Sequence, residues 1–164
     1  MFFKTYQKLL GASCLALYLA GCGNGGGGES PVEMSVNSEG EFSISSKADS
    51  VTIQGVKLNR DNCVVNFVPK ETLQMGAFMG VLSQMTPISI QDLKDMASTY
   101  KILDQKERLA NIENKISQLE QKGVMMEPQA LKFGEKIKGF SQECDIIEAE
   151  IQTDKGAWTL SFDK

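Results

Sequence analysis

The stretch that decides the fold is residues 144–162, CDIIEAEIQTDKGAWTLSF, close to the carboxyl end of the chain. Its first half alternates three apolar side chains, Ile147, Ala149 and Ile151, with three polar ones, Glu148, Glu150 and Gln152. This period of two is typical of a β-strand that has one face in the core and the other in water.

A tight turn and a second strand follow within the same stretch. Asp154-Lys155-Gly156 predicts a hairpin turn in which glycine takes the left-handed backbone conformation. Beyond the turn, Trp158, Leu160 and Phe162 fall on one face of the returning strand. We therefore expect a carboxyl-terminal β-hairpin whose last residues are packed against the core.

The remaining β pattern lies on both sides of a central helical stretch. Strands are expected at residues 32–36, around 42–44, and at 51–58, 63–68 and 130–133, with turns at 37–40 and 59–62. Gly55 breaks the alternation of its strand, which predicts a β-bulge, and Pro69 ends the strand before it.

Residues 70–125 have helical spacing instead. Ser89 suits the N-cap of a long helix, and Gly123 suits its end. The apolar positions repeat every three or four residues with one slip of register: Leu93, Met96, Tyr100 and Leu103, then Leu109, Ile112, Ile116 and Leu119. A single rod of about 33 residues would be roughly 50 Å long. The methionine-rich stretch 71–85 predicts a shorter arm that folds back along it through Thr86-Pro87.

These patterns predict an α+β fold, a small antiparallel β-sandwich or partly open barrel with an inserted helical hairpin. The expected domain spans residues 32–164, with the helical insertion at about 70–125. We expect a monomer. A coiled-coil dimer through the long helix is the less favoured alternative, because the helix has fewer than three clean heptads.

The amino terminus has the organisation of an export signal. Two lysines precede an apolar run, residues 9–18, that is too short to span a bilayer. The next four residues, Leu19-Ala20-Gly21-Cys22, resemble the lipobox of bacterial lipoproteins at every position. The resemblance implies a signal peptide at residues 1–21, cleavage before Cys22, and lipid attached to Cys22. The alternative is an ordinary cleaved signal that leaves this cysteine free.

The resemblance also implies a location. In this family, aspartate after the lipidated cysteine favours the inner membrane, whereas Gly23 points to the outer membrane. Residues 22–31 are rich in glycine and predict a lipidated, flexible tether with a reach of roughly 18 Å. We therefore expect an envelope protein that is held to the outer membrane by lipid on Cys22 and faces the periplasm or the cell surface.

Two cysteines are left in the expected mature domain, Cys63 and Cys144. An even pair in an exported domain favours a disulfide. The two residues are 81 positions apart, so that bond would contribute about 4 kcal/mol by restricting the unfolded chain. A catalytic or redox role has less support, because the chain has no Cys-x-x-Cys pair and no histidine.

The composition excludes several classes of function. Lys and Arg number 17 against 21 Asp and Glu, so the net charge of −4 argues against nucleic acid as a partner. The lack of histidine excludes Ser-His and Cys-His catalytic pairs and metal sites with histidine ligands. The acids between Glu143 and Glu150 are better explained as a solvated strand face than as a catalytic pair. We expect no enzyme, no metal and no cofactor.

The expected function is therefore binding. Candidate contact residues lie on the methionine-rich arm: Met75, Phe78, Met79 and Leu82. Methionine side chains adapt to different surfaces, which suits a non-enzymatic binding or adaptor protein that contacts another envelope protein. Packing of this arm in the protein's own core and insertion into the membrane interface are alternatives. A second candidate function is a periplasmic carrier of a lipid or other apolar ligand, held between the arms and the sheet.

Overall fold

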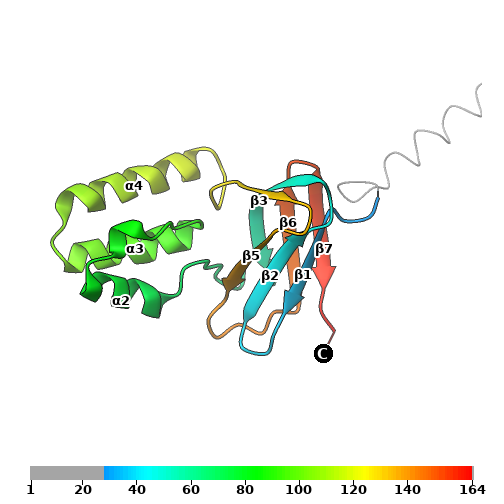
Figure 1. The fold of residues 1–164 in the computed structure, drawn as a ribbon, viewed down its shortest axis with the longest axis horizontal. Coiled ribbons are helices and arrows are strands. Elements are labelled where there is room, and N and C mark those ends of the chain that lie inside the picture. The colour runs from blue at the N-terminus through cyan, green and yellow to red at the C-terminus, as the bar shows by residue number, and fades with distance from the viewer. Residues whose placement is uncertain (1–27, 164) are drawn as a thin grey trace, which may run out of the picture.

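The computed structural model describes residues 28–163, which form a β domain with a group of helices projecting from it (Figure 1). In chain order the elements are β1 (Val32–Val36), β2 (Glu41–Ser46), β3 (Ser50–Leu58), α2 (Lys70–Met79), the short 3₁₀ helix η1 (Leu82–Gln84), α3 (Ile90–Ile102), α4 (Lys106–Gln121), β4 (Gln129–Lys132), β5 (Lys136–Phe140), β6 (Glu148–Thr153) and β7 (Gly156–Ser161). Cys22 and the expected signal peptide lie outside the described residues.

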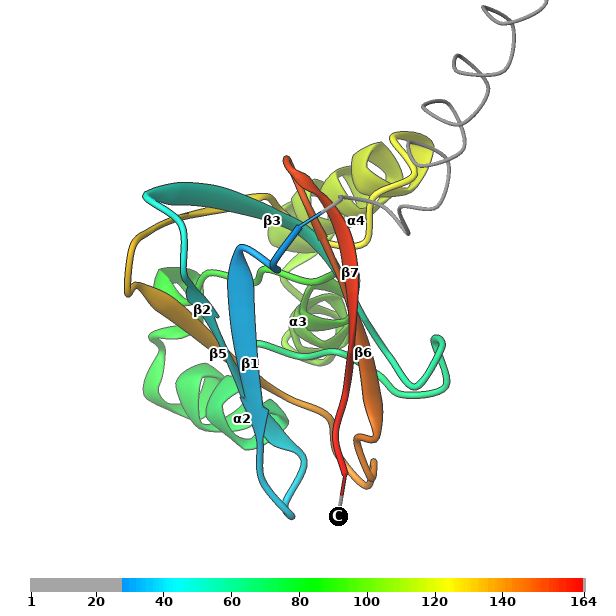
Figure 2. The ribbon, with the colours of Figure 1, turned by 90° about the vertical axis from the view of Figure 1, so that its right-hand side faces the viewer.

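Two antiparallel sheets make up the β domain, with strand orders β1-β2-β5 and β4-β3-β6-β7. Figure 2 views the domain from its far end, with the helices behind it. The inward side chains of both sheets form one core: Val32, Met34, Phe42, Ile44, Val51, Ile53, Val56, Leu58, Leu131, Ala149 and Ile151, joined by Met126 and Ile146 from loops. The expected α+β fold is confirmed as a small sandwich-like domain with helices, without closure into a barrel.

The carboxyl-terminal hairpin forms as predicted. Thr153 pairs with Gly156 across the turn, and Leu160 and Phe162 pack against the core. The alternation fails at one position, because β6 begins only at Glu148. Ile147 is therefore 54% exposed, and Ile146 takes its place in the core. The predicted irregularity at Gly55 is also present as a shift in the register between β3 and β6.

One strand was missed and another was wrongly predicted. β5 reads as a charged segment, KIKGF, yet it pairs with β2 along its whole length. Gly139 is essential to this pairing, because a Cβ atom there would collide with the ring of Phe42 on the neighbouring strand. Residues 63–68 do not form a strand; they make isolated bridges through Cys63 and Asn66 and then enter α2.

The prediction of a single long helix is wrong. The chain breaks after α3, where Asp104 has a φ of 52°, and α4 runs back along α3 (Figure 1). The slip in the apolar repeat marks this break. Folding back lets Leu109 and Ile112 of α4 cover Met96 and Tyr100 of α3, which a straight rod would leave in water. The insertion is thus three packed helices instead of a hairpin of two arms.

Candidate functional site

The helical insertion is fixed to the β domain by the buried carboxyl group of Asp92. Its Oδ1 accepts hydrogen bonds from the backbone N–H groups of Phe67 and Val68 at 2.9 and 3.1 Å, and from the side-chain amide of Asn66 at 3.2 Å. Its Oδ2 accepts from the N–H groups of Ile88 and Ser89 at 3.1 and 3.0 Å. Asp92 therefore gathers both ends of the segment that carries α2.

A second junction lies beside this one. Ser89 caps α3 with its side chain, which accepts from the Asp92 backbone N–H. The Ser89 hydroxyl itself donates to the carbonyl of Val65 at 2.7 Å, and Ser89 forms an isolated bridge with Met126. Because the start of α3 is bonded to segments both before and after the insertion, the helices have a defined position relative to the sheets.

Cys63 and Cys144 form a disulfide, with their Cα atoms 5.9 Å apart. The bond links the chain just before the insertion to the chain just before β6. Asn59 supports the same corner: its side-chain amide donates to the carbonyl of Asp145 at 2.7 Å, and its Oδ1 accepts from the N–H of Ile147 at 2.9 Å. The disulfide and this asparagine hold together segments about 80 residues apart.

The end of the insertion farthest from the sheets carries an exposed apolar surface, which we call the distal patch. Its members are Met75, Phe78 and Met79 of α2, and Ile102 and Leu103 at the end of α3. Phe78 is 94% exposed and Ile102 is 84% exposed, whereas most side chains of this size are at least half-buried in a folded domain. Exposed apolar patches of this kind are typical of interaction sites, so the distal patch is a candidate contact surface.

The sequence placed Leu82 among the contact residues, and the structure corrects this. Leu82 is 3% exposed and packs with Leu73, Met96 and Tyr100 inside the insertion. It turns inward because Gly80, with a φ of 74°, ends α2 and reverses the chain into η1. Ile102 was not among the predicted contact residues, and the break after α3 is what exposes it.

A groove borders the distal patch between α2 and α3. It has a volume of about 370 Å³, and it is lined by Leu73, Gln74, Ala77, Asp95, Ser98, Thr99, Ile102 and Leu103. Gln74 precedes Phe78 by one helical turn, so the groove lies next to the most exposed large apolar side chain among residues 28–163. We call it the distal groove. A projecting ring and a receiving groove thus share one face.

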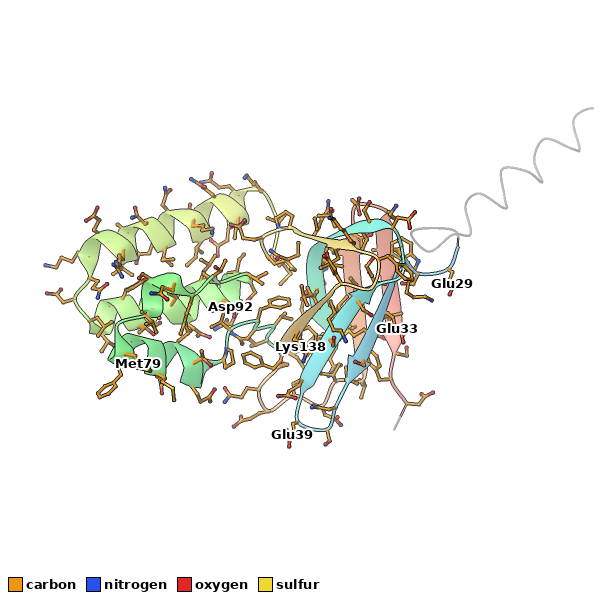
Figure 3. All side chains as sticks on the ribbon, viewed as in Figure 1. Glu29, Glu33, Glu39, Met79, Asp92 and Lys138 are labelled. Atoms are coloured by element: carbon orange, nitrogen blue, oxygen red, sulfur yellow. A yellow bond between two sulfur atoms is a disulfide. The ribbon has the colours of Figure 1, made fainter. Side chains whose placement is uncertain are left out.

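The amino-terminal end of the described chain lies at the opposite end of the molecule from the distal patch. Figure 3 labels Glu29 beyond the sheets and Met79 at the far end of the helices. Glu29 is held to the turn after β2 by an ion pair with Lys47. This hydrogen-bonded pairing lowers the pKa of the Glu29 carboxyl and raises the pKa of the Lys47 ammonium.

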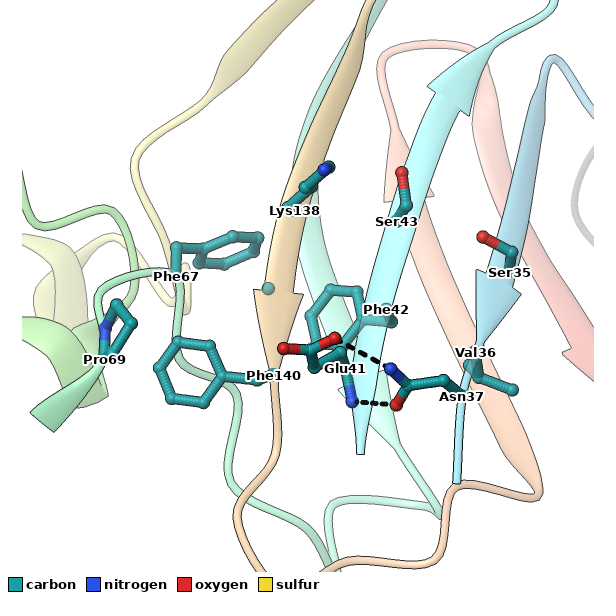
Figure 4. Close-up of a pocket in the computed structure, with 11 residues that line it drawn as sticks. Ser35, Val36, Asn37, Glu41, Phe42, Ser43, Phe67, Pro69, Lys138 and Phe140 are labelled. Atoms are coloured by element: carbon teal, nitrogen blue, oxygen red, sulfur yellow. Dashed lines mark hydrogen bonds between the residues drawn. The ribbon is translucent and has the colours of Figure 1, made fainter. Parts of the chain in front are cut away.

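Two other hollows lie closer to the β domain. One, of about 430 Å³, lies on the outer face of β1, β2 and β5, above Ser35 and Ser43 and beside Lys138 (Figure 4). Its lower rim is closed by the hydrogen bond from Asn37 to Glu41, 2.7 Å long. Short serine side chains explain this hollow, which is open to water.

The other hollow lies between the base of the helices and the β domain, and we call it the junction cleft. Its volume is about 330 Å³, and its walls include Val64, Ile90 and Met125. Lys94 and Glu120 form an ion pair of 3.7 Å beside it. This is the location at which the sequence placed a carrier's ligand.

Within residues 28–163, no three acidic or cysteine side chains are grouped to hold a metal ion. No helix in this part of the chain is both long and apolar enough to cross a membrane. Comparison with known proteins finds no family model, curated protein or solved structure that matches the chain. The site is therefore defined by its geometry: an α+β domain that presents an apolar patch on projecting helices.

Proposed function

We propose that this chain is a lipid-anchored envelope protein that acts without catalysis, by protein–protein contact through the distal patch. The observation that carries the proposal is the exposure of Phe78, 94%, beside the 84% exposed Ile102. Removing apolar surface from water is favourable by about 25 cal/mol per Å², so burial of these two side chains would contribute several kcal/mol that the isolated domain does not gain. A partner surface that covers them recovers this free energy.

The position of the anchor supports a contact away from the membrane. Cys22 and Glu29 are seven positions apart, so Glu29, at the edge of the β domain, lies within about 25 Å of the lipid. The helices extend the molecule in the opposite direction, and α4 alone adds about 24 Å. The distal patch therefore lies at the end of the molecule far from the anchoring bilayer, which disfavours its insertion into that bilayer.

The anchor itself can be tested with a matched pair of cysteines. In Cys22→Ser we expect loss of labelled palmitate from the protein and its release from the membrane fraction, because the acyl chains have no attachment site. In Cys14→Ser, which changes a residue of the expected signal peptide, labelling and membrane association are expected to be unchanged. Equal labelling of both variants would disprove lipidation at Cys22.

The contact is tested by placing a photoreactive phenylalanine analogue at Met79 in the full-length chain in cells. Met79 is 65% exposed at the edge of the distal patch, so it reports on whatever covers the patch. We expect an adduct with a protein chain. The matched control is the same analogue at Phe133, which is 70% exposed in the turn after β4. The absence of adducts from Met79, or equal adducts from Phe133, would contradict the proposed function.

The junction cleft favours one alternative, a carrier of an apolar ligand. At about 330 Å³ it is near the lower limit for ligand pockets, and Val64 and Met125 in its walls are 49% and 43% exposed. Native mass spectrometry of protein extracted from its own membrane distinguishes the two functions. A carrier brings a bound small ligand with it, whereas a binding protein gives masses that acylated protein chains account for, without an added apolar ligand.

A further inference from the structure

We propose that the partner covering the distal patch is a second copy of this chain, side by side with the first and facing the same way. The inference rests on the proposed function, since it names the partner of the same surface. Shape, charge, area and the position of the anchor each support this occupant.

Shape provides the first argument. Phe78 projects from α2, and the distal groove lies directly beside it, between α2 and α3. A two-fold axis that runs along this face, between the two copies, brings each Phe78 to the groove of the other copy, so both insertions occur together. The groove volume of about 370 Å³ has room for an aromatic ring. The same face thus contains both halves of a reciprocal contact.

Charge provides the second argument. The whole chain has a net charge of −4, so most of its faces repel a second copy. Residues 72–91 form an exception, because these twenty consecutive residues include no Asp, Glu, Lys or Arg. They contain most of α2 and the turn that follows it. An isologous interface places a surface against itself, and the uncharged α2 side of the distal patch avoids the repulsion of like charges there. On the α3 side, the groove contains Asp95, whose carboxylate accepts hydrogen bonds from the side-chain amides of Asn66 and Gln91.

The exposed apolar area of the distal patch is close to what a dimer interface requires. A fully exposed side chain of this class offers roughly 200 Å², so the exposed fractions of the five members, from 39% to 94%, amount to roughly 650 Å². This exceeds the largest apolar patch of a typical monomer, about 300–600 Å². It approaches the roughly 800 Å² that each partner contributes to a standard interface. With a polar rim added, the distal patch is large enough for the core of a dimer.

The anchor is compatible with this arrangement. When the two-fold axis runs along the molecule, both Glu29 residues lie at one end and both patches at the other. The tethers of the two copies then reach the same membrane. Confinement to that membrane raises the effective concentration of each copy for the other, which strengthens a contact of moderate area.

The experiment uses full-length chains in cells, with the photoreactive analogue at Phe78 and two different affinity tags on coexpressed copies. We expect an adduct that carries both tags, with cross-linked peptides from the distal groove around Ala77 and Ile102. Ile102→Glu is expected to reduce this adduct roughly tenfold or more, because it places a charge in each copy of the interface. Ile147→Glu, at a side chain 54% exposed in the β domain, is the matched control and is expected to leave the adduct unchanged.

Each other outcome overturns the inference in a recognisable way. An adduct with a different protein alone disproves the second copy but leaves the proposed function standing. An adduct with lipid, or no adduct from either Phe78 or Met79, disproves both. Thermal unfolding of Ile102→Glu separates a lost interface from a lost fold, since an exposed substitution is expected to leave the melting temperature of the monomer unchanged.

Discussion

Replacing Cys63 and Cys144 together by serine is expected to lower the free energy of unfolding by about 4 kcal/mol. The disulfide joins residues 81 positions apart and encloses the whole helical insertion. Without it, the unfolded chain gains the entropy of an open loop of this length, while the folded contacts are largely kept. For a domain of this size, the loss corresponds to a decrease of roughly 12–20 °C in melting temperature.

Chemical denaturation of the serine double variant and of the wild type, each with and without reductant, checks this result. Reductant is expected to bring the wild type to the stability of the variant and to leave the variant unchanged. The Asn59 side chain still bridges to Asp145 and Ile147 in the variant, so the corner is expected to keep its structure at low temperature. A variant within about 1 kcal/mol of the oxidised wild type would show that the cross-link contributes little.

Asp92→Asn is expected to cost about 3–4 kcal/mol, the second-largest effect. The Asp92 side chain is fully buried and receives hydrogen bonds from four backbone N–H groups, of Phe67, Val68, Ile88 and Ser89. Asparagine keeps the shape but replaces one oxygen by an NH₂ group. With the NH₂ group at the Oδ2 position, the N–H groups of Ile88 and Ser89 have no acceptor. With it at the Oδ1 position, the Val68 N–H has no acceptor and the Asn66 side-chain amide loses one of its two, because only the Phe67 N–H also reaches the other oxygen.

The matched control for this substitution is Asp95→Asn, one turn further along α3. Asp95 is only partly buried, and its carboxylate accepts hydrogen bonds from the side-chain amides of Asn66 and Gln91, at 3.0 Å each. The buried Asn66 amide keeps its hydrogen bond to Asp92, and the partly buried Gln91 amide can turn to water, so we expect a loss below about 1 kcal/mol. Hydrogen exchange of the Phe67 and Ser89 amides in both variants locates the effect. Equal stability of the two variants would refute the role of Asp92 as the junction.

Local sequence was sufficient for the parts of the fold that are locally determined. The hairpin from Glu148 to Ser161 follows from its alternation and its Asp-Lys-Gly turn, and the capping of α3 follows from Ser89. The disulfide pairing follows from there being two cysteines in the expected mature domain. In each case the determining residues are neighbours in sequence or have only one available partner.

The missed features depend on contacts between distant segments. Nothing in KIKGF indicates a strand, because its place is set by pairing with β2 and by the close approach of Phe42 to Gly139. The helix break at Asp104 was visible only as a slip in the apolar repeat. The sequence does not show that α4 buries more apolar surface by folding back over Tyr100 than by continuing α3 as a straight helix.

The same division holds for the site. The sequence by itself determined that residues near Phe78 are apolar, uncharged and helical, because composition and spacing are local properties. Only the tertiary structure decided which of them reach water: Leu82 turns inward after Gly80, while Ile102 is exposed beside α2. Exposure depends on what the rest of the chain covers. For that reason, the distal patch, its groove and its distance from Glu29 arise from packing and not from any single segment.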